Sequence, residues 1–224
     1  MTINFLNRTL TSIILLTVLY ICLFLSKFLW LYLLIIASFI SLYEFDKLIK
    51  KIYKKKQNKI ILINIFSFIY LFFFVFAGYN YYNTFSLFFI LTICIFSDTG
   101  GYIAGKLIGG KKLTKISPNK TVSGSIGSFV FSIIPIITFL LVSKNENNYE
   151  IMTNYNSNLF ALIIASLLLS FLCQLGDLFI SFFKRKAKVK DTGSLLPGHG
   201  GLLDRIDGLI FVLPITFILE SIFF

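Results

Sequence analysis

The segment from Ser181 to Asp207, SFFKRKAKVKDTGSLLPGHGGLLDRID, gathers charge in a chain dominated by Phe, Ile and Leu. It holds six of the 21 basic residues, three of the ten acidic residues and the only histidine. Asp204 and Asp207 are three positions apart at the start of the last apolar run, so a helix would place both on one face. Carboxylates beside basic side chains indicate a site for a hard cation and an anionic substrate.

Two further aspartates, Asp98 and Asp177, come at the ends of two other apolar runs. Each of the four acids taken alone could equally form a structural ion pair. Together they favour Mg²⁺, which binds oxygen ligands and typically takes one or two carboxylates, leaving other positions for substrate phosphates. We therefore predict a magnesium site formed by Asp98, Asp177, Asp204 and Asp207, and leave open whether a second cation binds beside the first.

The segment from Asp98 to Gly127, DTGGYIAGKLIGGKKLTKISPNKTVSGSIG, mixes glycines, lysines and small hydroxyl residues. Glycines let backbone amides approach an anion, lysines supply charge, and residues 117 to 121 place a turn before a helix whose N-terminal amides can bind phosphate. We interpret it as a polyphosphate cradle; a flexible basic loop that binds lipid headgroups is the alternative. A P-loop fold is excluded, because Lys112 replaces the hydroxyl residue that holds magnesium and no strand precedes the loop.

Other chemistries fit the residues poorly. One histidine, no nucleophile elbow and few nitrogen or sulfur ligands argue against a Ser-His-Asp hydrolase and against zinc. His199 lies in Pro-Gly-His-Gly-Gly, a loop too rich in glycine to be core. We predict that His199 contacts substrate, while a purely hydrogen-bonding role is the alternative.

The elements that must position these residues are membrane helices. Hydrophobic residues make up 57% of the 224 and charged residues 14%, and the mean hydropathy is +0.85, which is far more apolar than a soluble domain. Long alternating segments that would indicate a β-barrel are lacking. The sequence predicts an all-α, polytopic integral membrane bundle forming a single domain over residues 1–224, with about seven transmembrane helices at 9–26, 28–45, 60–78, 85–97, 122–142, 159–177 and 206–223.

The basic residues predict the orientation of this bundle. If the N-terminus is cytoplasmic, the inner segments 1–8, 46–59, 98–121 and 178–205 carry 19 of the 21 Lys and Arg residues. The positive-inside rule therefore predicts a cytoplasmic N-terminus and an active site on the cytoplasmic side of the inner membrane. The net charge of +11 needs no nucleic acid to explain it, and the lysine-rich segment 46–59 is typical of binding to anionic membrane lipids.

At these residues the sequence resembles the phosphatidate cytidylyltransferase family, also called CDP-diacylglycerol synthase. The matching pattern is Ser181-x2-Lys184-Arg185-x4-Lys190-Asp191-x-Gly193-x2-Leu196-Pro197-x-His199-Gly200-Gly201-x2-Asp204-Arg205-x-Asp207, and every position of it is filled. Gln174-Leu-Gly-Asp177, Asp98-Thr-Gly and Ser117-Pro-Asn-Lys-Thr121 are similar as well. Residues 85–224 would be the catalytic part, whereas residues 1–80 match only in being hydrophobic. One departure is Ser123, where the family usually has Glu.

The resemblance implies transfer of the cytidylyl group of CTP to phosphatidic acid, giving CDP-diacylglycerol and pyrophosphate in phospholipid biosynthesis. It implies catalytic roles for Asp177, Asp204, Asp207 and Lys190. It implies substrate binding by Lys111, Ser117, Asn119, Lys120, Thr121, Ser181, Lys184, Arg185, His199 and Arg205. The implied partners are CTP, phosphatidic acid and membrane lipids, and a homodimer is left open.

Two rival functions remain at this stage. One is a related CTP-using membrane enzyme that acts on another lipid phosphate or on a polyprenol. The other is an ion or solute transporter, in which the acids would line a path across the bilayer. A transporter favours acids at mid-span and Gly or Pro breaks in matching halves of the chain, and the sequence places its acids near one end of the spans instead.

Overall fold

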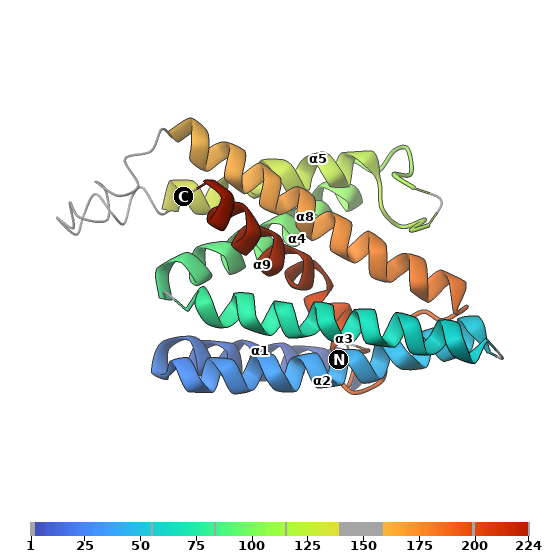
Figure 1. The fold of residues 1–224 in the computed structure, drawn as a ribbon. Helices are drawn as coiled ribbons and strands as arrows, with labels where there is room; N and C mark the ends of the chain where they lie inside the picture. Colours follow the sequence, from blue (N-terminus) through green and yellow to red (C-terminus); the bar gives the residue numbers. More distant parts are fainter. Residues whose placement is uncertain are drawn as a thin grey trace. The chain divides into compact units, whose positions relative to one another are not determined.

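The computed structural model describes residues 3–54, 56–82, 84–114, 116–138, 159–198 and 200–223, and in these ranges the regular secondary structure is helical. The only β-type pairing there is two isolated bridges, Lys112 with Thr121 and Leu196 with Gly200. The helices are α1 (Ile3–Leu25), α2 (Lys27–Tyr53), α3 (Gln57–Asn80), α4 (Thr84–Leu107), α5 (Val122–Phe131), α8 (Leu159–Lys186) and α9 (Leu203–Phe223) (Figure 1). Every predicted apolar run overlaps one of them, which confirms the all-α class.

Four of these helices carry a segment long and apolar enough to cross a bilayer: Lys27–Tyr53, Gln57–Asn80, Leu87–Leu107 and Leu159–Lys186. Shorter apolar helical stretches lie at Thr9–Leu25 and Val122–Thr138. The chain is therefore a multi-pass membrane protein. The total of seven crossings stays a prediction, since part of the 122–142 run lies outside the described residues.

Two predicted boundaries were too early. The runs 85–97 and 159–177 were ended at an aspartate, whereas α4 continues to Leu107 and α8 to Lys186. Asp98 and Asp177 therefore lie inside helices, each nine residues before the last one. The physical reason is that a helix ends where its backbone hydrogen bonding stops, and an isolated polar side chain does not stop it. Residues 98–107 of the predicted cradle are accordingly helical.

The described chain forms two compact units, each of which is considered by itself. The first comprises Met1–Phe88 and Phe179–Phe224, and the second comprises Phe89–Leu178. The boundaries fall within α4 and α8, so each of these helices contributes to both units. A single integral domain over the whole chain stays a prediction.

In the first unit, α2 runs beside α3, and α9 packs against both (Figure 1). Polar groups inside these apolar helices find partners across the packing. Trp30 Nε1 donates to the carbonyl of Gly78 at 2.8 Å. Pro214 within α9 has no N–H, so the carbonyl of Ile210 loses its helical donor, and Tyr70 Oη donates to it at 3.1 Å.

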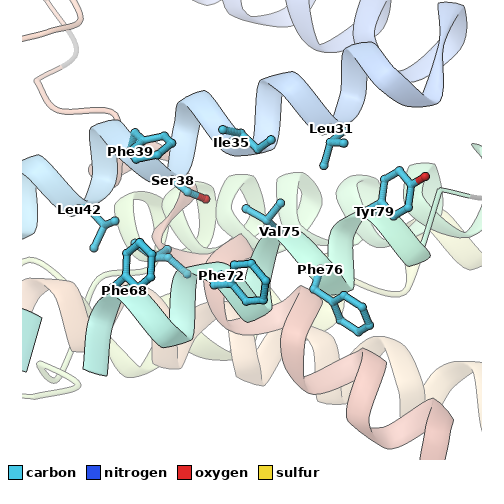
Figure 2. A pocket seen from close by; sticks show the side chains of 11 residues that line it. Leu31, Ile35, Ser38, Phe39, Leu42, Phe68, Phe72, Val75, Phe76 and Tyr79 are labelled. Atoms are coloured by element: carbon cyan, nitrogen blue, oxygen red, sulfur yellow. The ribbon is translucent and has the colours of Figure 1, made fainter. Parts of the chain in front are cut away.

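An apolar pocket of about 430 Å³ lies between α2 and α3 (Figure 2). Its walls are formed by Leu31, Ile35, Ser38, Phe39, Leu42, Phe68, Leu71, Phe72, Val75, Phe76 and Tyr79. Ser38 is 6% exposed, and its hydroxyl has no hydrogen-bond partner among the described residues. The pocket is thus hydrocarbon-like, with one unsatisfied hydroxyl in its wall.

In the second unit, glycines bring α4 and α5 into backbone contact. A Cβ added at Gly127 would meet Ala104 Cβ and lie 2.7 Å from the carbonyl oxygen of Gly100. A Cβ at Gly100 would collide with Phe131 in the same way. Small residues at such positions let membrane helices approach closely. These two glycines of the predicted cradle therefore pack helix against helix, while phosphate binding by the cradle stays a prediction.

Candidate active site

Asp204 stands in the first turn of α9 and is the centre of a hydrogen-bonded cluster. Its Oδ1 lies 2.6 Å from Lys184 Nζ in an ion pair whose side chains are 15% and 7% exposed. Its Oδ2 accepts hydrogen bonds from Thr192 N at 2.8 Å, Thr192 Oγ1 at 2.9 Å and Gly201 N at 3.3 Å. A carboxylate is favoured at a helix N-terminus, where backbone N–H groups are free. The cluster therefore ties the end of α8 and the loop before α9 to one side chain.

The end of α8 directs the chain into this cluster. Lys188 has φ of 55°, and Val189 N donates to the carbonyl of Lys184 at 3.0 Å. This left-handed residue with a six-to-one hydrogen bond is a common way to end a helix. It keeps Lys184 on the last turn of α8 while the chain reverses towards Thr192.

A short turn precedes α9 and contains the predicted histidine. Leu196 N donates to the carbonyl of Gly200 at 2.9 Å, and Gly200 N donates back to that of Leu196 at 3.1 Å. Gly198 and Gly200 have φ of 77° and 87°, in the left-handed region that favours glycine. The glycines of Pro-Gly-His-Gly-Gly are thus explained by the turn. His199 lies outside the described residues, so its substrate contact stays a prediction.

The other predicted residues of this segment differ in exposure and in hydrogen bonding. Asp207 lies three residues further along α9, and its Oδ1 accepts the N–H of Gly208 at 2.9 Å. Ser181 is 7% exposed. Arg185, Lys190 and Arg205 are exposed.

The second unit holds the remaining two aspartates. Lys120 Nζ, from the loop before α5, lies 2.5 Å from Asp177 Oδ2 on α8. Asp98 on α4 accepts a hydrogen bond from Cys173 Sγ at 3.5 Å. Cys173 stands one helical turn before Asp177 on α8, so this hydrogen bond brings Asp98 to the same part of α8 as the ion pair. The structure therefore brings together, within one unit, three predicted residues from three separate segments.

The loop from Ile108 to Thr121 is closed by backbone hydrogen bonds. Leu113 N donates to the carbonyl of Lys120 at 2.8 Å, and Val122 N donates to that of Lys111 at 2.9 Å. Thr121 is the N-cap of α5, since its Oγ1 accepts the N–H of Gly124 at 3.0 Å. The predicted helix start after Thr121 is confirmed.

The remaining side chains predicted to bind substrate in this loop differ in exposure. Lys111 and Asn119 are exposed. Ser117 is 8% exposed, and its amide donates to Thr114 Oγ1 at 3.2 Å. Lys111 and Asn119 are therefore available to a ligand, whereas Ser117 supports the turn.

Ser123, where the family usually has Glu, also closes this loop. Its Oγ donates to the carbonyl of Gly109 at 2.5 Å and lies 2.9 Å from Thr121 Oγ1. Gly109 has φ of 63°. The small hydroxyl thus links the start of the loop to its end.

No group of three or more His, Cys, Asp or Glu side chains gathers in the described part of the chain. The Asp98 and Asp177 pair fits Mg²⁺, because Mg²⁺ typically takes one or two carboxylates and completes its shell with water and substrate phosphates. Asp204 fits less well as a ligand, since both of its oxygens already accept protein donors.

One buried acid escaped the sequence reasoning. Glu44 on α2 is 3% exposed and accepts hydrogen bonds from Thr192 Oγ1 and from the amides of Leu202 and Leu203. The available signal was a lone carboxylate inside the predicted span 28–45, which is costly in a membrane unless it has partners.

Comparison with known proteins agrees with the pattern of residues. The sequence profile of the cytidylyltransferase family matches residues 50–223. A phosphatidate cytidylyltransferase of Staphylococcus haemolyticus is 46% identical over 125 residues, which is 55% of this chain and 44% of that protein. Proteins of the same name are 45% identical over 124 residues in Staphylococcus aureus and 43% identical over 133 residues in Staphylococcus epidermidis, covering 55% and 58% of this chain and 44% and 47% of theirs.

The aligned region thus covers less than half of each of these relatives. The family match, in contrast, extends over most of this chain and includes Asp98, Lys120, Asp177 and Asp204. The chain belongs to the cytidylyltransferase family.

Proposed function

We propose that the chain transfers the cytidylyl group of CTP to phosphatidic acid, giving CDP-diacylglycerol and pyrophosphate. The observation that carries this proposal is the cluster of Lys120, Asp177 and Asp98 in the second unit. It combines a cation from a loop of phosphate-binding composition with two carboxylates at membrane helices. The printed names of the staphylococcal relatives support the same reaction.

The proposed reaction requires two anions to meet. An oxygen of the lipid phosphate attacks the α-phosphorus of CTP, a new P–O bond forms, and the bond to the departing pyrophosphate breaks. A phosphate at neutral pH already carries the nucleophilic oxygen, so no general base is needed, and catalysis rests on positioning and charge compensation. Lys111 and Lys120 supply positive charge in the loop of the second unit.

Mg²⁺ is the proposed cofactor, with Asp98 and Asp177 as the residues that would hold it. When bound, it would compensate the negative charge that develops on the phosphate groups. Lys120 already touches Asp177, so a bound phosphate would compete for the same ammonium group.

The proposed location is the inner membrane, with the N-terminus in the cytoplasm. A diacyl lipid stays in its leaflet while CTP arrives from the cytosol, so the active site must lie near the cytoplasmic ends of the helices. The last turn of α2 carries Lys50 and Lys51, and the last turn of α8 carries Lys184, Arg185 and Lys186. This basic bias supports the proposed side. A homodimer stays a prediction, which size measurement in detergent would test.

The acyl chains of the lipid need an apolar surface, and we propose the pocket between α2 and α3 for one of them (Figure 2). Both helices are candidate membrane spans, so the pocket lies among segments that meet hydrocarbon. Its walls are aliphatic and aromatic apart from Ser38 and the ring hydroxyl of Tyr79. A hydrocarbon chain suits such walls better than any water-soluble ligand.

The deciding experiment uses the purified chain in detergent with labelled CTP, phosphatidic acid and MgCl₂. We expect a lipid-soluble cytidine product and pyrophosphate in equal amounts. Parallel reactions with another lipid phosphate and with a polyprenol test the related-enzyme alternative, because product there and none with phosphatidic acid would reassign the acceptor. Absence of product with every lipid, from protein that remains folded, would contradict the proposal.

A further inference from the structure

The first unit contains a carboxylate that the family pattern does not include. Glu44 lies on α2, six residues before the matched range begins at residue 50. We infer that Glu44 is a positioning residue, which holds the segment from Thr192 to Leu203 and thereby sets the place of Asp204. That Glu44 holds this segment does not depend on the proposed function, whereas the effect of Glu44 on turnover rests on that function.

The hydrogen bonds of Glu44 all come from that one segment. Oε1 accepts the N–H of Leu202 at 3.1 Å, and Oε2 accepts the N–H of Leu203 at 2.9 Å. Leu203 is the first residue of α9, so these are free amides of a helix N-terminus. Among the described residues Glu44 has no cationic partner, and its charge is stabilised by these amides and the helix dipole. A buried carboxylate bound in this way fixes where α9 begins relative to α2.

Thr192 connects this carboxylate to Asp204. Its Oγ1 lies 2.8 Å from Glu44 Oε2 and 2.9 Å from Asp204 Oδ2. A hydroxyl carries one hydrogen, so it donates to one carboxylate at a time. The hydrogen bonding of Asp204 therefore depends on where Glu44 stands, and through Asp204 so does the position of Lys184.

Two glycines of the segment make room for Glu44. The three atoms nearest to a Cβ built on Gly193 all belong to Glu44, and its carboxyl carbon would lie at 2.8 Å. A Cβ on Gly201 would meet Thr192 Oγ1, Glu44 Oε2 at 2.5 Å and the backbone nitrogen of Gly193 at 2.7 Å. Neither glycine has a positive φ, so contact with neighbours, and not backbone conformation, requires the missing side chain.

The test compares Glu44→Gln and Glu44→Asp with Asp46→Asn. Asp46 is a matched control, because it is also a carboxylate on α2 but binds Lys50 at 2.6 Å and Asn64 at 2.6 Å instead. Amide hydrogen exchange of the full chain in detergent is the structural readout. We expect Glu44→Gln to speed exchange at Leu202 and Leu203 by about tenfold or more, since it removes charged acceptors, and Asp46→Asn to leave both unchanged. Unchanged exchange in Glu44→Gln would overturn the inference.

Measurements of kcat and KM distinguish a positioning role of Glu44 from an effect on protein stability alone. We expect Glu44→Gln to lower kcat by about tenfold or more while KM for CTP changes by less than about threefold, and Glu44→Asp to recover part of the loss. A fall in activity that only follows the unfolded fraction would show a structural role alone. If the parent chain has no turnover, the exchange measurement still decides whether Glu44 holds the segment, so the two failures are distinguishable.

A series of single and double variants tests the contact between Gly193 and Glu44 directly. Gly193→Ala should slow the enzyme in the parent, and Glu44→Asp, which shortens the opposing side chain, should relieve part of that effect. Gly201→Ala serves as the control, because its clash includes the backbone nitrogen of Gly193 and cannot be relieved in this way. Additive effects of Gly193→Ala and Glu44→Asp would contradict the proposed contact.

Discussion

Lys120 Nζ lies 2.5 Å from Asp177 Oδ2, so a residue of the loop before α5 is joined to the middle of α8 by an ion pair. The side chains are 26% and 35% exposed, which leaves both open to an incoming ligand. Asp98 on α4 belongs to the same unit and accepts a hydrogen bond from Cys173, which stands one helical turn before Asp177 on α8. One ammonium group and two carboxylates thus belong to one compact unit.

Asp177→Asn should therefore abolish most activity while the protein still folds. Under the proposed function the variant removes one of two carboxylates that would hold Mg²⁺, which costs several kcal/mol of transition-state stabilisation, so kcat should fall by about two orders of magnitude or more. Labelled-CTP turnover measures it, with thermal unfolding as a check on folding. The exposed Lys51→Gln on α2 is the control and should keep near-normal turnover; near-normal turnover of Asp177→Asn would remove it from the site.

The buried pair of Lys184 and Asp204 should behave non-additively. Lys184→Met leaves the Asp204 carboxylate without its cation and should destabilise the protein by about 3 kcal/mol. Asp204→Asn in the same chain should cost less than it does alone, because no unpaired charge then remains. Thermal unfolding of the two single variants and the double variant measures this coupling, and purely additive shifts would argue against the ion pair.

Gly127→Ala should loosen the second unit. The added methyl meets Ala104 and would lie 2.7 Å from the carbonyl oxygen of Gly100, so α4 and α5 must separate at a cost of about 1–3 kcal/mol. Val130→Ala is the matched control on α5, since Val130 is 58% exposed. Equal melting temperatures of the two variants would contradict the close helix contact.

Tyr70→Phe should destabilise the protein, because the Ile210 carbonyl, which receives no hydrogen bond from Pro214, then also loses the donor on Tyr70. The lost hydrogen bond to Ile210 should destabilise the protein by about 1 kcal/mol, the scale of interhelical hydrogen bonds in membranes. In a Pro214→Ala background the helix can supply its own donor to that carbonyl, and Tyr70→Phe should then cost less. Unfolding in detergent is measured for the parent, the two single variants and the double variant. An equal loss of stability from Tyr70→Phe in both backgrounds would disprove the coupling.

Val75→Trp should fill part of the pocket between α2 and α3. If an acyl chain of the lipid substrate lies there, KM for long-chain phosphatidic acid should rise by several-fold relative to a short-chain lipid, while KM for CTP stays unchanged. Phe66→Trp places the same indole ring on the exposed side of α3, outside the pocket walls. This control should have no such effect. Equal lipid preference in the two variants would place the acyl chain elsewhere.

The sequence by itself determined what depends on local patterns. Runs of apolar residues predicted the helices, and the excess of basic residues in alternate segments predicted an orientation. The pattern of residues from Ser181 to Asp207 indicated the family, because all of its positions lie within 27 consecutive residues and can be read directly from the sequence. Helix ends were less predictable, because Asp98 and Asp177 ended the apolar pattern without ending the backbone hydrogen bonding.

Only the tertiary structure decided which of these residues meet. The pairing of Lys120 with Asp177 joins positions 57 apart, and that of Glu44 with Leu203 joins positions 159 apart. Such contacts depend on how helices pack, and single-sequence periodicity contains no information about which helix lies beside which. The glycines show the same limit, because the sequence alone does not reveal that a neighbouring helix occupies the space beside Gly127 and that the Glu44 carboxylate occupies the space beside Gly193.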